Sequence, residues 1–502
     1  AYIVREQMAR GDGYAGMISH ADKVSHHFRS PSGGGLGLDS SDGGFAAGLR
    51  VHKAINRRLT DAATKGGAHA VLSVTWTELS RMNGVNLATA LHRIAKHCVD
   101  CGDMGASPSD VAKEVQSVPA FGALISALEQ RARTAVQPQE TDHYGSDDGP
   151  LPAQCASIVA WSLATLGIRN NPLLDVLALL AYPRLDEFKP FEVTNLLWAF
   201  AKLGTPCPDL YRSVSQRIKM RHKGEFKAQC LSLAVWSFAT GRWRDEELFR
   251  SMAEELCSQA SLLKPQEISN TLWAFGKQKI NHRPLFHAFG SAASEGTALC
   301  RFKPQELANT LWAFASVGMS HPTLFAKAAA TAARRSLNLS PGNIANILWA
   351  YSSVGCQDCP DLAPTLLDVA ASSASQYKPR ELASVARAAA QMCPHHLKFF
   401  DACAKSFQSR PQSFSLNHLA HLAEAFSVAD KACSAPSWAL PAILKEQQTQ
   451  RSRYELQLPE FESGCNLHNF TGVSAISTDA NSDGSDSGSD FDDCTEWPIA
   501  NK

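Results

Sequence analysis

Apolar residues recur along the chain at the spacing of one helix face, most clearly in the stretch Phe302–Ala315, FKPQELANTLWAFA. We take Trp312 as position 0 and advance about 100° per residue. Positions −5, −1 and +2 (Leu307, Leu311 and Phe314) then share one face, and small residues occupy −4 and +1 beside it. This pattern predicts an amphipathic helix that packs on a partner helix and whose flanks admit close neighbours.

The same pattern returns along the chain at a nearly fixed interval. Its further copies are Leu151–Ala164, Phe188–Ala201, Phe226–Ala239, Leu263–Gly276, Leu339–Ser352, Tyr377–Ala390 and Phe414–Ser427. Position 0 is occupied in turn by Trp161, Trp198, Trp236, Trp273, Trp312, Trp349, Arg387 and Glu424, at steps of 37, 38, 37, 39, 37, 38 and 37 residues. Each copy is followed by a turn and a second apolar-periodic stretch. Such a period is typical of stacked repeats, so we predict an all-α fold, an α-solenoid of helix–turn–helix repeats with a 37–39 residue period.

Composition sets the expected boundaries around this array. We expect a disordered Gly/Ser-rich segment over 1–50, degenerate N-terminal helical repeats over 51–136, an acidic linker over 137–150, the regular array of eight repeats over 151–430, an irregular C-terminal segment over 431–477 and a disordered acidic Ser/Asp tail over 478–502. Within 51–136, Asn86–Lys96 matches the repeat helix and places His92 in the Trp position.

The charge distribution permits a polyanionic partner without requiring one. The whole chain has 48 basic and 48 acidic residues, but residues 151–430 hold 28 basic and 21 acidic residues. The segment Asp479–Asp493 holds six Asp and no basic residue. A mildly basic array is therefore joined to an acidic tail.

The face opposite the apolar one, at positions −7, −3, 0 and +4, carries amide, aromatic and basic side chains. Amides can bond base edges, flat side chains can stack on bases and Lys can meet phosphate, which is the chemistry of single-stranded RNA recognition. The side-chain type at −3 varies between repeats, as a base-selecting position would. The candidate RNA-binding residues are Asn195, Lys202, Gln266, Asn270, Lys277, Gln305, Asn309, Asn346, Arg380 and Ser384.

These positions also have structural explanations. The Asn residues at −3 can bond a neighbouring helix or form a ladder between repeats. The Trp residues at position 0 favour packing between repeats over base stacking, because a large aromatic side chain seals a repeat junction well. We expect this packing role for Trp161, Trp198, Trp236, Trp273, Trp312 and Trp349. The Glu at −6 in several copies suits the first turn of a helix, where the helix dipole favours an acid.

Other candidate chemistry is weak. The pairs Cys98–Cys101 and Cys356–Cys359 have CxxC spacing but lie far apart in a solenoid, so we expect no metal site. Glycine-rich phosphate loops and nucleophile–base motifs are missing from the sequence, so we expect no catalytic residue, no cofactor and no enzyme. No apolar run approaches the roughly 18 residues of a membrane span, so we expect no membrane insertion.

The recurring core P-x-E-(L/I/V)-(A/S/T)-N-x-L-W-A-(F/Y) resembles the octotricopeptide repeat and the related helical arrays of FAST-kinase-like and RAP-domain proteins. It is also similar to the helical-repeat subunit of the RNA-editing substrate-binding complex. The resemblance implies binding of organellar single-stranded RNA (mRNA or rRNA) along a concave face, at about one nucleotide per repeat. It also implies a role in RNA processing, stability, translation or ribosome assembly, with other ribonucleoprotein subunits as further partners. A RAP domain does not follow the array, which argues against cleavage activity.

The resemblance implies a mitochondrial location, in the matrix, with the plastid as the alternative. The sequence begins at Ala1 rather than Met, so we expect an incomplete N-terminus. Arg387 and Glu424 depart from the Trp at position 0, and we expect the last repeats to cap the array. The alternative function is a protein-binding α-solenoid scaffold within an organellar ribonucleoprotein assembly.

Overall fold

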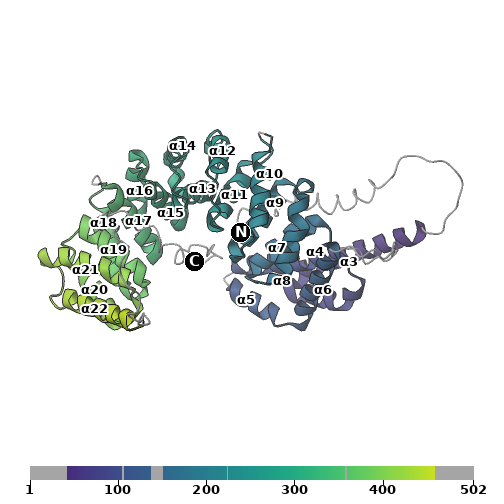
Figure 1. The fold of residues 1–502 in the computed structure, drawn as a ribbon, viewed down its shortest axis with the longest axis horizontal. Coiled ribbons are helices and arrows are strands. Elements are labelled where there is room, and N and C mark those ends of the chain that lie inside the picture. Colours follow the sequence, from purple (N-terminus) through teal and green to yellow (C-terminus); the bar gives the residue numbers. More distant parts are fainter. Residues whose placement is uncertain (1–41, 104–106, 137–150, 223, 357–358, 458–502) are drawn as a thin grey trace, which may run out of the picture. The chain divides into compact units, whose positions relative to one another are not determined.

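The computed structural model describes residues 42–103, 107–136, 151–222, 224–356 and 359–457. Over these residues the chain is built from helices joined by short turns, without a strand, and consecutive helices pack in series. The predicted all-α solenoid of helix–turn–helix repeats is therefore confirmed (Figure 1). The chain forms two compact units, whose described residues run from 42 to 251 (unit 1) and from 252 to 457 (unit 2).

Unit 1 begins with helices that precede the regular repeats. Its helices are α3 (Asp42–Glu78), α4 (Gly84–Asp103), α5 (Pro108–Gln116), α6 (Pro119–Val136), α7 (Ala153–Leu166), α8 (Asn171–Ala181), α9 (Pro190–Leu203), α10 (Pro208–Lys219), α11 (Ala228–Thr240) and the first part of α12 (Glu246–Cys257). The helices α4, α7, α9 and α11 pack one on the next as the first helices of successive repeats. The His92 ring centroid lies 5.3 Å from that of Trp161, so α4 continues the Trp positions toward the N-terminus.

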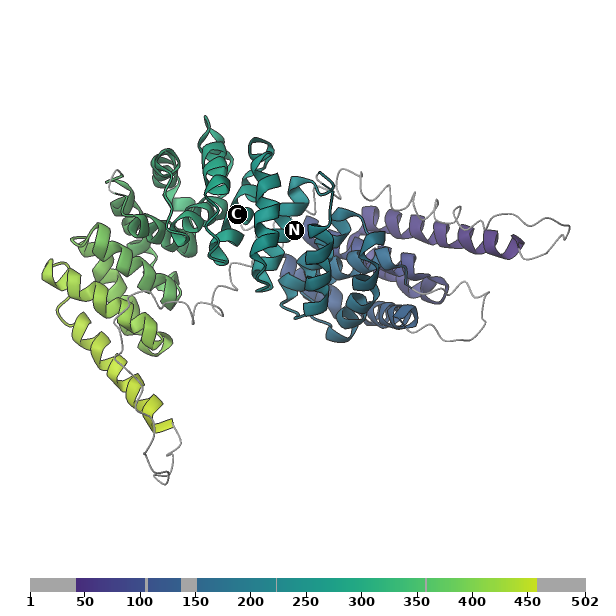
Figure 2. The same ribbon diagram turned by 45° about the horizontal axis from the view of Figure 1, so that its top comes forward.

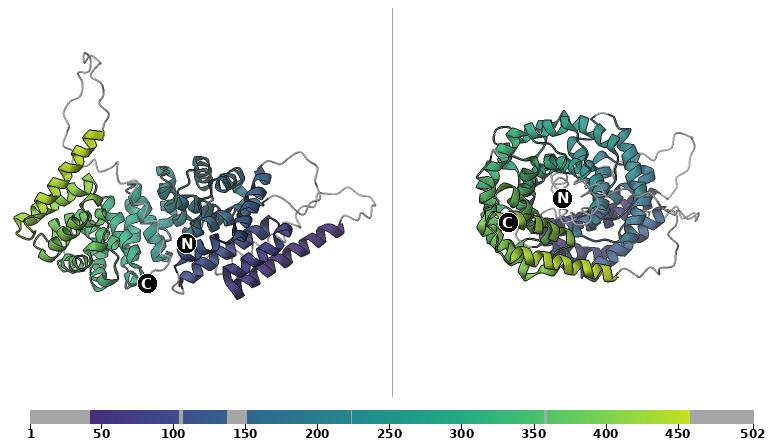
Figure 3. Two further views of the ribbon diagram at one scale, coloured as in Figure 1. Left: turned by 90° about the horizontal axis from the view of Figure 1, so that it is seen from below. Right: turned by 60° about the vertical axis from the view of Figure 1, so that its left-hand side comes forward.

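Unit 2 holds five repeats in the same two-layer arrangement. Its helices after α12 are α13 (Pro265–Lys277), α14 (Arg283–Ser294), α15 (Pro304–Ser316), α16 (Pro322–Arg334), α17 (Pro341–Val354), α18 (Leu362–Ser372), α19 (Pro379–Met392), α20 (Leu397–Ser409), α21 (Leu416–Lys431) and α22 (Ala439–Gln457). The first helices α13, α15, α17, α19 and α21 form one layer, and the second helices α14, α16, α18 and α20 form the other (Figures 1 and 3).

The predicted apolar face forms the core between the two layers. Leu307 is 1 % exposed, and Leu311 and Phe314 are fully buried. Aromatic rings continue this core from repeat to repeat: Phe314 meets Phe286 edge-on at 5.0 Å, and Phe325 meets Tyr351 at 5.1 Å. The small residues at −4 and +1 are buried, as expected from their size, except Ala420 in the last repeat, which is exposed.

Each repeat starts and stops at fixed backbone features. Short 3-10 turns precede most first helices, for example η3 (Ala260–Leu262), η4 (Ala298–Arg301) and η5 (Ser336–Asn338). In six of the eight repeats the turn after the first helix has a left-handed residue six positions beyond position 0. Positive φ angles occur there at Gly167, Gly204, Arg242, Lys279, Gly318 and Gly355.

Two expected boundaries differ from the structure. The segment 1–50, expected to be disordered, overlaps α3, which begins at Asp42. The segment 431–477, expected to be irregular, contains the 19-residue helix α22, which packs against α21 (Figure 2). Its Ala, Leu, Lys, Glu and Gln residues favour a helix even though the repeat pattern has ended. The expected linker 137–150 and the expected tail 478–502 lie outside the described residues.

Candidate nucleic-acid interface

The Trp residues at position 0 are buried at the junctions between first helices. Exposure of the whole residue is 0 % for Trp198, 5 % for Trp273 and 9 % for Trp312, whereas Trp349 is half-buried. The ring centroids of Trp312 and Trp349 lie 6.2 Å apart at an interplanar angle of 33°. Burial of this kind fits the packing role expected for these residues and leaves Trp349 the most accessible of the six.

The −3 residues differ in accessibility between repeats. In unit 1 they are Ile158, Asn195 and Leu233, which are 7 %, 2 % and 1 % exposed. In unit 2 Asn270 is 9 % exposed, and the following −3 residues are half-buried: Asn309, Asn346, Ser384 and His421. Asn195 and Asn270 each keep one buried amide atom, Oδ1 and Nδ2 respectively, without a hydrogen bond to the described residues.

Positions −7 and +4 lie at the two ends of the same face. Their predicted RNA-binding residues are all half-buried: Lys202, Gln266, Lys277, Gln305 and Arg380. The Lys202 Nζ atom lies 5.1 Å from the centroid of the Trp198 ring, in cation–π geometry. Burial lowers the pKa of this ammonium group to about 8.

A further basic position was missed by reasoning from the sequence. A lysine occupies position −9, directly before the first helix, in five repeats: Lys189, Lys227, Lys264, Lys303 and Lys378. The structure places each of them at the N-cap of its helix, exposed or half-exposed. The recurring Lys-Pro pair before four of these helices was the signal that could have revealed them.

Helix stability does not explain these lysines. A Lys side chain cannot accept a hydrogen bond from the first turn, and its charge is unfavourable at the positive end of a helix dipole. Capping is performed instead by the Glu three residues later: Glu306 accepts a hydrogen bond from the Lys303 backbone N–H at 2.8 Å, and Glu192 does the same for Lys189. Burial raises the pKa of both carboxyl groups.

The lysines could be present to pair with the capping Glu, or to contact a ligand. One repeat distinguishes these two roles. In the repeat of α11 the capping position holds Cys230, yet Lys227 is present and exposed. A lysine therefore occurs at −9 both with and without the acid. In unit 1 the lysines precede α9 and α11, and in unit 2 they precede α13, α15 and α19, so each unit has a basic row at the same end of its first helices. Position −9 of the other three repeats is occupied by Pro152, Ser340 and Ser415.

The last two repeats replace the Trp with charged side chains. Arg387 Nη1 donates a hydrogen bond to His421 Nε2 at 3.1 Å, and Arg387 Nε lies 3.9 Å from a Glu424 carboxylate oxygen. This contact shows that position 0 of one first helix lies against position −3 of the next. The Arg387 and Glu424 side chains remain 34 % and 64 % exposed.

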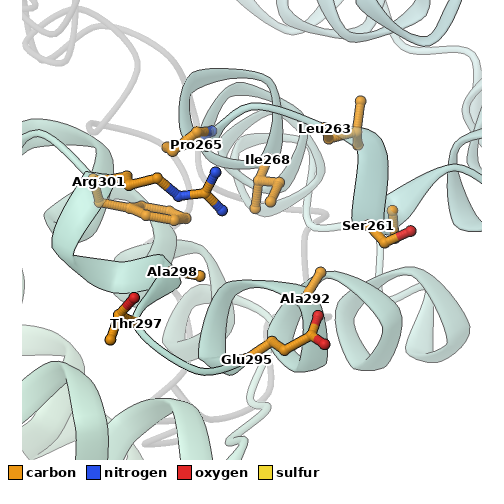
Figure 4. Close-up of a pocket in the computed structure, with 11 residues that line it drawn as sticks. Ser261, Leu263, Pro265, Ile268, Ala292, Glu295, Thr297, Ala298 and Arg301 are labelled. Atoms are coloured by element: carbon orange, nitrogen blue, oxygen red, sulfur yellow. The ribbon is translucent and has the colours of Figure 1, made fainter.

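A pocket of about 200 Å³ lies in unit 2, between η3, η4 and the ends of α13 and α14 (Figure 4). Leu263, Ile268 and Ala298 line it, and Glu295 and Arg301 add charged groups. These residues belong to the 3-10 turns and the layer boundary, and none is at positions −7, −3, 0 or +4. The pocket is therefore separate from the candidate interface.

Metal-ligating groups do not assemble in the part of the chain that the structure describes, where three or more His, Cys, Asp or Glu side chains never come together at a candidate metal site. Cys98 and Cys101 both lie on α4, and burial raises the pKa of the Cys98 thiol to about 12. Both cysteines are therefore protonated at neutral pH, since burial also raises the pKa of Cys101.

Comparison with known proteins points to one family. Residues 151–322 match the model of the RNA-editing substrate-binding complex 6 protein family. The matched stretch runs from the start of the regular array to the first residue of α16. No match was found among curated proteins. Over its first repeats the chain is thus similar to the helical-repeat proteins of an RNA-editing complex.

Proposed function

We propose that this chain is a non-catalytic RNA-binding repeat protein that works within a ribonucleoprotein assembly, and that single-stranded RNA lies along the first helices. The observation that carries the proposal is the row of lysines at the N-caps of first helices, several of which also carry an amide side chain at position −3. Phosphates repeat along an RNA strand, and a basic group at the same position in five of the eight repeats is suited to contact them. The candidate contacts proposed from the sequence, among them Asn309, Asn346 and Arg380, belong to this surface.

The family match supports the same assignment. The matched proteins are named for an RNA-editing substrate-binding complex, so their name concerns a complex that binds RNA. The resemblance to octotricopeptide and FAST-kinase-like arrays supports organellar mRNA or rRNA as the ligand. We place the protein in the mitochondrial matrix, with the plastid as the alternative. Among the described residues, every helix is too short or too polar to cross a membrane.

Protein docking is a second candidate function, favoured by one specific observation. Two leucines in 3-10 turns of unit 2 are strongly exposed: Leu262 at 79 % and Leu337 at 87 %. Apolar side chains presented on turns suit contact with another protein subunit. Leu262 stands two residues before Lys264, at the start of the same repeat helix, so a docked subunit and bound RNA would meet near this turn.

The test is titration of the full chain with fluorescently labelled single-stranded RNA of mixed sequence, over a salt series. We expect the logarithm of the binding constant to fall linearly with the logarithm of the salt concentration, because phosphate contacts release counterions. Duplex RNA of the same length is the control and is expected to bind more weakly, since its bases are not available. Lack of single-stranded RNA binding at low salt would reject the proposal and leave the docking function.

A further inference from the structure

We infer that base reading is confined to unit 2, at the −3 residues of four first helices: Asn309, Asn346, Ser384 and His421. Unit 1 then contributes phosphate contacts without reading sequence. This inference rests on the proposed function, because it assigns base reading to unit 2 and only phosphate contact to unit 1.

The −3 side chains of unit 1 are unsuited to reading bases. Ile158 and Leu233 have no hydrogen-bonding group in their side chains. Asn195 does have one, but the residue is 2 % exposed, so its amide is inaccessible to a base. Sequence reading in single-stranded RNA needs polar groups that reach the base edges. In these three repeats that condition fails at every −3 position.

The −3 side chains of unit 2 meet the condition. All of them are polar, and the four from α15 to α21 are half-buried, which fixes the side chain while leaving part of it accessible. Asn270, the first in unit 2, is 9 % exposed and stands at the limit between the two groups. The −3 side chains are therefore apolar or buried up to α13, and polar and half-buried from α15 onward, so the change falls within unit 2 between α13 and α15.

The residues at position 0 also become more exposed toward the C-terminal end of the array. Trp312 is 9 % exposed and Trp349 is half-buried, after which the Arg387 side chain is 34 % exposed. The 3.1 Å contact of Arg387 with His421 shows that the two positions are adjacent across neighbouring first helices. A base placed at −3 in this region thus has an aromatic or cationic group beside it, suited to stacking or to a phosphate.

The four side chains also predict the form of the RNA motif. At one nucleotide per repeat, four readers select about four nucleotides rather than eight. Asn309 and Asn346 present the same amide and should prefer the same base at two consecutive positions. Ser384 has a hydroxyl, and His421 has an imidazole whose Nε2 accepts a hydrogen bond from Arg387, so the remaining two positions should have preferences of their own.

The experiment is selection of bound RNAs from a random single-stranded pool by the full chain, followed by sequencing. Asn309→Ala and Asn346→Ala are the test variants. Asn195→Ala is the matched control in unit 1, and Leu233→Met is a second control that preserves core volume if Asn195→Ala fails to fold. Each protein is also titrated with the selected RNA and with the unselected pool.

We expect a motif of about four positions. Each test variant should randomise one position and weaken binding of the selected RNA about tenfold, with little change for the unselected pool. The folded control should keep the motif. A motif of about eight positions, loss of a position in the unit 1 control, or an unchanged motif in both test variants would overturn the inference while leaving RNA binding intact. Failure to bind any RNA at low salt would instead reject the proposed function itself.

Discussion

Arg335 Nη1 donates a hydrogen bond to the backbone carbonyl oxygen of Phe302 at 2.7 Å and so ties two successive repeats of unit 2 together. Arg410 makes the same bond to the Tyr377 carbonyl oxygen at 2.6 Å. Both arginines stand 14 residues before position 0 of their repeat. At the corresponding place before Trp312 the chain has Ala298, and the 200 Å³ pocket lies there against Leu263 (Figure 4).

Replacing Ala298 with Arg should therefore stabilise unit 2. The new guanidinium can repeat the bond to the carbonyl oxygen of the preceding repeat, which is worth about 1 kcal/mol of unfolding free energy. Urea unfolding followed by circular dichroism measures the change. Ala298→Met is the matched control, since it fills space without adding a donor. Equal stability of the two variants would show that the hydrogen bond makes no contribution.

The left-handed residue after each first helix predicts opposite effects at two equivalent positions. Gly318 has φ 67°, and a Cβ built there would meet no atom within 4 Å. Gly318→Ala should therefore lower the free energy of unfolding by about 1–2 kcal/mol through backbone strain alone. Lys279 has φ 55° at the same place in the preceding repeat. Lys279→Gly should therefore raise the free energy of unfolding by roughly 0.5–1 kcal/mol, because Gly adopts this conformation without strain. Thermal unfolding of both variants tests the pair. Destabilisation by Lys279→Gly would contradict the account of this turn.

The N-cap of α16 predicts a loss of stability in acid. His321 Nδ1 accepts a hydrogen bond from the Leu324 N–H at 3.3 Å, which requires a neutral ring. Burial and the neighbouring His287 lower the pKa of His321 below its ordinary value of about 6.5. The unfolded chain thus binds the proton more readily, so this contribution is complete above the ordinary pKa and is lost as the pH falls below it.

His321→Asn is the variant that isolates this effect, because Asn caps a helix without titrating. We expect the urea midpoint of the wild-type chain to fall between pH 7 and pH 5, and to fall less in the variant. A pH profile unaffected by the substitution would exclude His321 as a source.

The lysines at position −9 should control affinity without controlling sequence. Lys303→Gln combined with Lys378→Gln should weaken binding of all single-stranded RNAs alike. The slope of log affinity against log salt should become shallower by about 0.7 for each phosphate that the protein no longer neutralises. Lys398→Gln is a control, since Lys398 lies in a second helix beside Asp368 at 3.4 Å. An unchanged slope in the double variant would remove the lysine row from the interface.

The architecture could be predicted from the sequence because the same helix pattern recurs in successive repeats. Trp312, Leu311 and Phe314 recur with their spacing, so the helix, its core face and its period were all predictable. The accessibility of the −3 positions was not, since it depends on how closely neighbouring first helices approach one another. Asn195 and Asn309 occupy the same place in their repeats, yet one is buried and the other half-buried.

Two further features required the folded chain. Lys303 precedes a helix start and looks like an ordinary surface residue until its equivalents are seen at the N-caps of the first helices. The helix α22 has no repeat signature, and its contact with α21, including the bond from Gln450 Nε2 to the Phe414 carbonyl oxygen at 3.0 Å, becomes evident only in three dimensions.

Ultraviolet crosslinking of the full chain to labelled single-stranded RNA, with the crosslinked peptides mapped by mass spectrometry, determines whether the RNA lies along the first helices. We expect crosslinks in the first helices and their N-caps, concentrated on α15, α17, α19 and α21. Crosslinks confined to the second helices α14, α16, α18 and α20 would contradict this expectation.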